Sequence, residues 1–256
     1  MRALATQLQI LNALVLRETR TRFGRHRLGY VWALLEPVLF IAMFGTIYML
    51  LDRTMPAGLP LAPFLATGFL PFLAFNKIKT QSMNAVSGNK GLLFYPDVRP
   101  LDLVVARVVL ELATYLTVFA IIMGAVAIVD ERFQVDSLLL TMVGFGLTAG
   151  LGLGLGLVLC GLSTFSLAIE RLAPAMTRPL FWVSALFFST NELPTDAQNV
   201  VLLNPLLHAI ELTRDGWFTG YHVPQVNVLY PAAWMLVLLY FGLTLERVAR
   251  RRLELT

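Results

Sequence analysis

Residues that could carry out chemistry are few in this sequence, and their spacing matches no catalytic pattern. The phosphate-binding loop of nucleotide hydrolases needs a glycine directly before its lysine, and no lysine here has one. The histidines are scattered, so no Ser/His/Asp or Cys/His set and no His-Glu-x-x-His zinc motif can be assembled. We therefore expect no catalytic residue, no metal site and no cofactor in this chain, and any chemical energy that it uses must come from a partner. The residues concerned are Lys77, Lys79, Lys90, His26, His208 and His222.

Basic residues do form a pattern, because they fall in alternate gaps between long apolar stretches. All but three of the 20 lysines and arginines lie before the first stretch, after the last one, or beside every second gap. An excess of Lys and Arg marks the cytoplasmic side of a membrane protein. We therefore expect a multi-pass protein of the bacterial inner membrane with both termini in the cytoplasm, and no nucleic-acid partner. The three exceptions are Arg53, Arg132 and Arg214.

The apolar stretches are long enough to cross a bilayer as helices. Hydrophobic residues make up 57% of the chain and charged residues 14%, whereas soluble domains carry roughly a quarter charged residues. A helical span needs about 20 apolar residues, and helices pair the backbone groups that lipid cannot. We predict an all-α membrane protein with six transmembrane helices, at about 31–51, 60–80, 103–129, 137–160, 172–190 and 228–245. The second contains Pro63, Gly68 and Pro71, so it should extend past Phe75 or kink.

The first 30 residues form a separate unit before the transmembrane domain of residues 31–256. Leu4, Leu8, Leu11 and Val15 recur at helical spacing, and arginines follow them. This pattern predicts a cytoplasmic amphipathic helix that lies in the membrane interface. The helix could serve as a membrane-surface anchor or as a docking surface for a cytoplasmic partner, and the two roles are compatible.

Charged side chains near the cytoplasmic ends of the spans must be paired or hydrated, since an unpaired charge in lipid costs a few kcal/mol. Glu36 lies about one turn inside the first span, where it could reach water or an arginine, or act in gating or a partner contact. Arg107 and Glu111 stand at i,i+4 near the start of the third span. We expect these two to pair on one helix face.

The connections and the fourth span contain three further features. The loop of residues 81–102 is polar but contains Phe94 and Tyr95, so it is either an ordinary connection or an interaction element. Glycines in the fourth span recur at small-xxx-small spacing, as in Gly150/Gly154 and Gly152/Gly156, which suits close helix packing within the chain or in a dimer. The gap of residues 191–227 is too short and polar to span twice, so we predict short re-entrant periplasmic helices there, between spans five and six.

Three segments of the sequence resemble a known family. The segment from Arg22 to Pro37 combines basic residues with Leu-Gly-x-x-Trp-x-Leu-x-Glu-Pro, and the segments 95–102 and 204–211 extend the match. Together with the span layout, they resemble the membrane subunit of the ABC-2 type exporters of bacterial surface polysaccharides, in particular the capsular (polysialic acid) permeases. The resemblance covers essentially the whole chain.

The resemblance implies an ATP-driven machine of several subunits. It implies a homodimer of permeases bound to two copies of a separate ATPase subunit, which would hold ATP and Mg. The cargo would be a lipid-linked polysaccharide that passes from the cytoplasm to the periplasm between the two permeases. A periplasmic adaptor and an outer-membrane exporter would continue the route.

The same analogy suggests roles for particular residues. ATPase coupling would fall to the N-terminal helix and the loop of residues 81–102. A lipid phosphate or an acidic glycan would meet basic residues near the membrane, and aromatic residues on one face of the first span would line the channel, because aromatic rings stack on sugars. The coupling residues would be Arg17, Arg20, Arg22, Lys90, Tyr95, Asp97 and Arg99. The entrance residues would be Arg25 and Arg27, the channel residues Trp32, Phe40, Phe44 and Tyr48, and the periplasmic exit residues Trp217 and Phe218.

Other functions fit the sequence less well. An ABC-2 permease for O-antigen, teichoic acid, a drug or haem would share the layout and differ in cargo. An intramembrane acyl- or glycosyltransferase would need clustered carboxylates or histidines on one side of the membrane, and a proton-driven carrier would need intramembrane carboxylates. The channel aromatics could also simply face lipid or the protein core.

Overall fold

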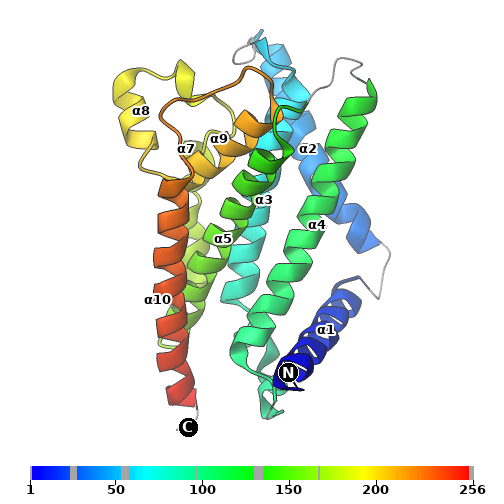
Figure 1. Cartoon of the computed structure of the whole chain (residues 1–256), viewed down its shortest axis with the longest axis vertical. Coiled ribbons are helices and arrows are strands. Elements are labelled where there is room, and N and C mark those ends of the chain that lie inside the picture. The colour runs from blue at the N-terminus through cyan, green and yellow to red at the C-terminus, as the bar shows by residue number, and fades with distance from the viewer. Residues whose placement is uncertain are drawn as a thin grey trace.

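The computed structural model describes residues 2–23, 28–52, 58–95, 97–129, 135–166 and 168–253. Five helices within these ranges are long and apolar enough to cross a membrane. They are α2 (Leu28–Leu50), α3 (Leu61–Met83), α4 (Pro100–Val129), α5 (Leu138–Ser163) and α10 (Leu229–Leu253), and they run roughly along the long axis of the molecule (Figure 1). The predicted extension of the second span past Phe75 is confirmed, because α3 continues to Met83.

Helices α3 and α5 form the centre of the bundle. The Cβ that an alanine at Gly152 would add lies 2.8 Å from the carbonyl oxygen of Phe75 on α3, so only glycine allows this approach. On the other side of α5, a Cβ at Gly154 would lie 2.7 Å from the Cβ of Leu238 on α10. The glycine spacing of the fourth span therefore serves helix packing within the chain, as one of the two alternatives predicted.

The fifth predicted span, residues 172–190, is wrong as a continuous helix. The chain forms α6 (Ala168–Thr177) and α7 (Leu180–Val183), and then an irregular segment that leads to the short 3₁₀ helix η3 (Thr190–Glu192). A proline lacks the backbone N–H and its ring clashes with the preceding turn, and both Pro174 and Pro179 fall in this stretch. Ala185 has a positive φ of 57°, which ends any regular helix. Helix α6 continues past Pro174 and ends before Pro179, so Pro179 lies at the break in a stretch whose hydropathy alone suits a span.

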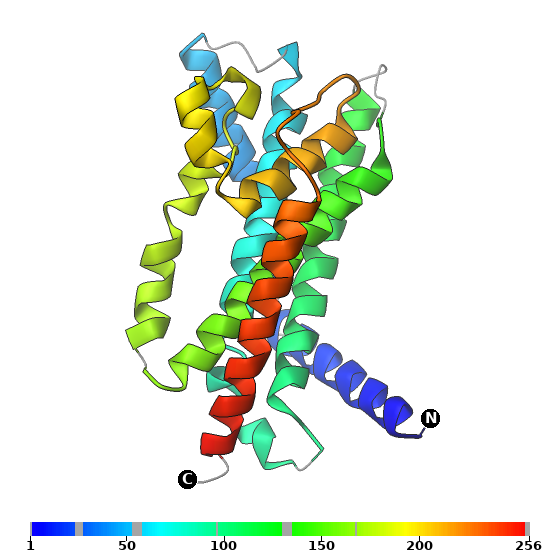
Figure 2. The same cartoon turned by 60° about the vertical axis from the view of Figure 1, so that its left-hand side comes forward.

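The gap of residues 191–227 contains short helices, as predicted, although one of them is buried rather than superficial. Helix α8 (Thr195–Val201) lies at the edge of the molecule, whereas α9 (Pro205–Trp217) packs against α3, α5 and α10 (Figure 2). The side chain of Asn204 accepts a hydrogen bond from the Leu206 amide at 3.0 Å, which caps α9, and Pro205 begins its first turn. The N-terminus of α9 is therefore fixed at Asn204, and the helix lies inside the bundle.

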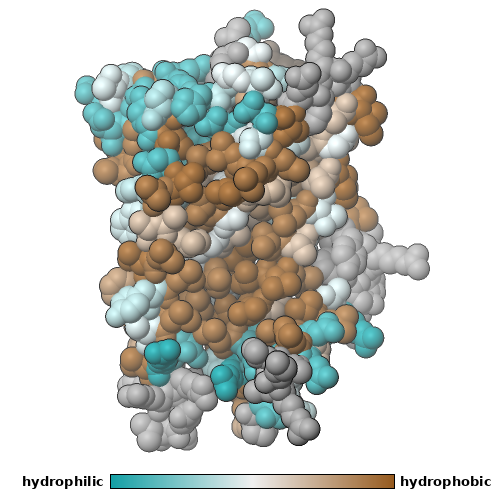
Figure 3. Space-filling view, in the orientation of Figure 1, coloured by the Kyte–Doolittle hydropathy of each residue, from teal (hydrophilic) through white to brown (hydrophobic). Residues whose placement is uncertain are grey.

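The two ends of the chain lie at the same end of the molecule (Figure 1). Helix α1 (Arg2–Phe23) lies obliquely there against α4, and the 3₁₀ helix η2 (Ser87–Phe94) connects α3 to α4 below it. In Figure 3 apolar side chains cover the middle of the molecule, and polar side chains gather at both ends. This banding is what a bilayer-spanning bundle requires.

Candidate functional site

Helix α1 attaches to the bundle through an apolar face. Leu14 is buried and belongs to a small core with Leu103 and Val104 of α4. Leu8 of the predicted apolar stripe is 66% exposed on the protein, and the placement of this stripe in the membrane interface stays a prediction. The contact face is rotated toward Leu14 because α1 packs against α4 on one side only, and the sequence pattern alone does not identify that side.

Polar contacts fix α1 at its C-terminal half. The Arg107 Nε atom of α4 lies 3.2 Å from a carboxylate oxygen of Glu18, and Arg107 also donates to the Gln81 and Asn84 carbonyls. The Arg17 guanidinium donates to the Asn89 amide oxygen at 3.0 Å. Arg107 therefore forms an ion pair with Glu18 of α1, which the sequence did not predict, and its predicted pairing with Glu111 of its own helix stays a prediction.

Around this attachment lie the residues that we predicted to couple to an ATPase. Phe94 and Tyr95 are 89% and 63% exposed, which is unusual for aromatic side chains. The structure brings α1 and η2 together at one end, and the exposed predicted residues there are Arg17, Arg20, Lys90, Tyr95, Asp97 and Arg99. The side chains of Arg22, Arg25 and Arg27 lie outside the described residues. The coupling and entrance roles stay predictions.

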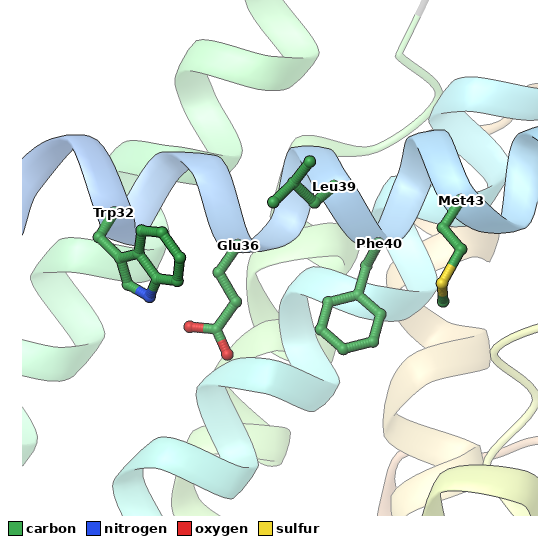
Figure 4. Close-up of a pocket in the computed structure, with 5 residues that line it drawn as sticks. All are labelled: Trp32, Glu36, Leu39, Phe40 and Met43. Atoms are coloured by element: carbon green, nitrogen blue, oxygen red, sulfur yellow. The ribbon is translucent and has the colours of Figure 1, made fainter.

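A groove of about 290 Å³ runs along the outer face of α2. Its lining side chains, with Trp32, Glu36 and Phe40 one turn apart, project to one side of the helix (Figure 4). A carboxylate oxygen of Glu36 lies 3.2 Å from the Lys77 Nζ atom of α3, and both side chains are partly exposed. Glu36 thus has a lysine partner that the sequence analysis did not name, and its contact with water stays a prediction. The groove is lined by Trp32, Glu36, Leu39, Phe40 and Met43.

The predicted row of channel aromatics divides into two groups. Trp32 is exposed and lines the groove with Phe40. Phe44 instead packs in the interior, with its ring centroid 4.5 Å from that of Phe187, and Tyr48 is buried and donates its hydroxyl to the Phe187 carbonyl. These two residues therefore attach α2 to the irregular segment after α7. Phe40 is partly buried, with its ring centroid 5.8 Å from that of Phe69, so Trp32 is the exposed member of the predicted row.

A buried polar network, which the sequence reasoning missed, joins α9 to the same irregular segment. Glu211 accepts hydrogen bonds from the Thr190 amide at 3.0 Å, the Thr190 hydroxyl at 2.8 Å and the Tyr221 hydroxyl at 2.7 Å. Burial raises the pKa of Tyr221, so its hydroxyl stays protonated and can donate to the carboxylate. The carboxylate is thereby satisfied without water.

Arg214 completes this network. Its guanidinium donates to the carbonyls of Leu186 at 3.1 Å and Phe188 at 3.2 Å, and it lies 3.7 Å from a carboxylate oxygen of Glu211. Both charged side chains are fully buried. The i,i+3 spacing of an acid and a base inside a half-apolar segment was the available signal for this pair.

The predicted exit residues lie in the core. Trp217 and Phe218 are buried, and the Trp217 ring packs edge-on against Phe119 of α4 at a centroid distance of 5.4 Å. Both rings therefore pack inside the protein, at the C-terminal end of α9. A role at an exit stays a prediction.

Comparison with known proteins places these features in context. Residues 9–218 match the protein family described as ABC-2 type transporter. The chain is 35% identical over 241 residues to the polysialic acid transport protein KpsM of Escherichia coli, covering 93% of this chain and 92% of that protein. It is 28% identical over 243 residues to the capsule polysaccharide export inner-membrane protein CtrC of Neisseria meningitidis serogroup B, covering 95% and 92%. The O-antigen export system permease protein RfbA of Klebsiella pneumoniae is 23% identical over 84% of the chain and 82% of that protein.

Proposed function

The chain belongs to the ABC-2 type transporter family, and from this premise we propose that it is the membrane permease of an ATP-driven exporter of lipid-linked capsular polysaccharide. The direction of transport is from the cytoplasm to the periplasm. The observation that carries this proposal is the 35% identity, over nearly the full length, to a polysialic acid transport protein. The long apolar helices of this chain fit the role of a membrane conduit.

The power for transport comes from a separate ATPase. Two permeases and two ATPase subunits, which hold ATP and Mg, form the complex, and a periplasmic adaptor and an outer-membrane exporter continue the route. The end of the molecule with α1 and η2 supports this arrangement, because Tyr95, Asp97 and Arg99 are exposed there beside the attached α1 helix. A partner on this surface would cover the exposed Phe94 ring.

The bundle has six crossings, the fifth of which is interrupted. Five long helices and the segment of residues 168–190 together return the chain to its starting side, which supports cytoplasmic N and C termini. The Arg214 and Glu211 side chains pair the polar backbone groups of residues 186–190, and irregular backbone at membrane depth requires such pairing by protein. Helix α9 is then the re-entrant element between crossings five and six.

The translocation path runs along the groove of α2. Trp32, Glu36 and Phe40 offer aromatic rings and a carboxylate on one accessible face, which suits a polymer with apolar ring faces and hydroxyl groups. Phe44 and Tyr48 support this face from behind, since they contact the interior. A second copy of the chain would close the path from the other side.

A second candidate cargo is O-antigen, because the chain is also similar to an O-antigen permease. That protein is less similar, at 23% identity over a smaller share of the chain. Teichoic acid or another amphipathic cargo would use the same layout. Capsular polysaccharide remains the primary proposal because several capsule export proteins match over a larger share of this chain.

The function is tested by export in cells. Deletion of the gene should leave lipid-linked polymer inside, protected from a glycan hydrolase added to the periplasm, and a plasmid copy should restore its release. If the polymer that accumulates is O-antigen, the second cargo is correct. If no surface polymer is retained in the deletion strain, the chain is not its exporter.

The coupling surface is tested by copurification with the ATPase. Replacing Tyr95 and Arg99 by alanine should reduce the amount of bound ATPase. The matched control replaces Glu192 and Asp196, which are exposed at the opposite end, and should not change it. Equal copurification of the two double variants would place the ATPase elsewhere.

A further inference from the structure

The helical ladder of the fifth crossing is broken at Arg178 and Pro179. Proline has no backbone N–H to donate to the last turn of α6. The first hydrogen bonds of α7 come from the Phe181 and Trp182 amides, and they return to the carbonyls of Arg178 and Pro179 at 3.1 and 3.0 Å rather than into α6. A break of this kind is a point at which a helix can bend, so the orientation of α6 depends on its side-chain contacts.

The part of the crossing that follows the break is held by several polar contacts. In the segment of residues 183–190, two carbonyls accept hydrogen bonds from Arg214. Asn204 donates to the Val183 carbonyl at 3.1 Å and to the Ser184 hydroxyl at 2.8 Å. Because Arg214 lies on α9 and Asn204 caps its N-terminus, this segment is fixed to α9.

Helix α6, which precedes the break, is attached more loosely. It packs mainly against α5, Ala173 is the buried one of its ten residues, and Figure 2 shows it in yellow-green at the edge of the bundle. Its polar link to α3 is the buried Lys79, whose Nζ atom lies 2.7 Å from the Thr177 hydroxyl and 2.8 Å from the Asn76 amide oxygen. The Thr177 hydroxyl donates its own hydrogen to the Ala173 carbonyl at 2.9 Å, so its lone pairs are available to the ammonium.

We infer that α6 is a hinged arm that turns about Arg178 and Pro179, and that Lys79 is the latch that holds this arm on α3. A hydrogen bond from an ammonium is stronger than one between neutral groups. Thr177 is neutral, so release of the arm leaves no buried counter-charge behind, as release from a carboxylate would. The role of the arm rests on the proposed function: it changes the cytoplasmic half of the conduit while α9 holds the other half.

The experiment measures how fast a buried cysteine on each side of the break reacts with N-ethylmaleimide. The full-length permease alone, in nanodiscs, first receives Cys160→Ala, which removes its single cysteine. Ala173→Cys and Ala185→Cys then place a thiol at matched buried alanines before and after Pro179. Thr177→Val, which removes the acceptor for Lys79, should raise the reaction rate at position 173 about tenfold, the factor that corresponds to roughly 1.4 kcal/mol. The rate at position 185 should stay unchanged.

Three controls separate release of the arm from other effects. Thr177→Ser keeps the hydroxyl and should keep the wild-type rate. Thr114→Val removes the same kind of local bond, from the Thr114 hydroxyl to the Leu110 carbonyl at 2.7 Å on α4, and should change neither rate. Leu172→Cys places the thiol at an exposed position of α6, where the rate should not depend on the latch. Lys79→Met should act like Thr177→Val, which decides the question if the lysine variant does not fold.

Two outcomes would overturn the latch and a third would overturn the hinge. An unchanged rate at position 173 in Thr177→Val would show that Lys79 does not hold the arm, and an equal rise at positions 173 and 185 would show a general loosening of the protein. A hinged arm keeps its internal hydrogen bonds, so amide exchange within α6 should stay slow in Thr177→Val. Accelerated exchange throughout α6 would mean that the helix unravels instead of turning.

Failure of the arm can be distinguished from failure of the proposed function. The reaction rates need neither the ATPase nor a cargo, so a faster reaction at position 173 in a chain that exports no polysaccharide would leave the arm standing and the function wrong. Normal export together with equal rates in wild type and Thr177→Val would leave the function standing and the arm wrong.

Discussion

Two of the ion pairs of the molecule lie in very different surroundings, and the contrast separates structure from function. Glu211 and Arg214 have side chains with no exposure and share their hydrogen bonds with the backbone of residues 186–190. Glu36 and Lys77 are closer together, at 3.2 Å against 3.7 Å, yet both are partly exposed. Distance between the charges therefore says little about what a pair does.

Burial and the remaining hydrogen bonds decide the role of each pair. A buried pair depends on hydrogen bonds to its remaining donors and acceptors, and removal of one partner leaves an uncompensated charge. In Arg214 both terminal nitrogens donate to carbonyls, whereas Nε has no partner among the described residues. An exposed pair contributes about 0–1 kcal/mol to stability and is available to other ligands. We infer that Glu211–Arg214 holds the interrupted fifth crossing together, whereas Glu36–Lys77 contributes little to the fold.

The largest effect should come from Arg214→Met. The variant leaves the Glu211 charge buried and removes the donors to the Leu186 and Phe188 carbonyls, so it should destabilise the chain by about 3–5 kcal/mol. The measurement is thermal unfolding of the purified protein in detergent. Arg178→Met, at an exposed arginine, is the control and should change the midpoint little. Equal midpoints for the two variants would contradict a structural role for the buried pair.

A smaller loss of stability should follow from a substitution that pushes α9 away from α5. A Cβ at Gly144 would lie 2.6 Å from the Thr213 amide nitrogen and 2.7 Å from the Ala209 carbonyl oxygen, whereas a Cβ at Gly146 meets nothing within 4 Å. Gly144→Val should therefore cost about 1–3 kcal/mol by overpacking. Gly146→Val carries the same change in helix propensity and should unfold near the wild-type midpoint. If both variants have the same unfolding midpoint, α9 does not pack tightly against α5.

Much of the fold could be predicted from the sequence, because long apolar runs and helical spacing are local signals. The extension of α3 past Phe75 and the packing role of Gly152 and Gly154 were predicted on that basis. The prediction of a continuous fifth span failed because an average hydropathy does not register Pro179, which lies at the break between α6 and α7. The side chain of Arg214, which satisfies the broken backbone, comes from another helix and gives no local signal there.

The candidate site was harder to predict, because contacts between distant residues decide it. Helical spacing placed Trp32, Phe40, Phe44 and Tyr48 on roughly one face, but it could not show that the last two turn toward Phe187. In the same way, spacing found Glu111 beside Arg107. It could not show that the docking of α1 also brings Glu18 to Arg107, from 89 residues away in the sequence.

The pair of Glu18 and Arg107 is intermediate between the two extremes, and its removal should have an intermediate, local effect. The side chains are 17% and 14% exposed. Arg107→Gln should cost about 1–2 kcal/mol, because the arginine also donates to two carbonyls. Amide hydrogen exchange should then accelerate in α1 and stay slow in α5. The control is Arg99→Gln, whose side chain is exposed, and exchange that accelerates in α5 as much as in α1 would show that α1 is not a separate docked unit.

The smallest effect on stability should come from Lys77→Gln, and this result would complete the contrast. Because the Glu36–Lys77 pair is partly exposed, its loss should change the free energy of unfolding by less than about 1 kcal/mol. Salt screens accessible charges more than buried ones, so the difference between Lys77→Gln and wild type should shrink further at high salt, while the defect of Arg214→Met persists. A loss for Lys77→Gln as large as that for Arg214→Met would mean that the groove pair is structural. A small loss would instead show that the accessible pair contributes little to folding.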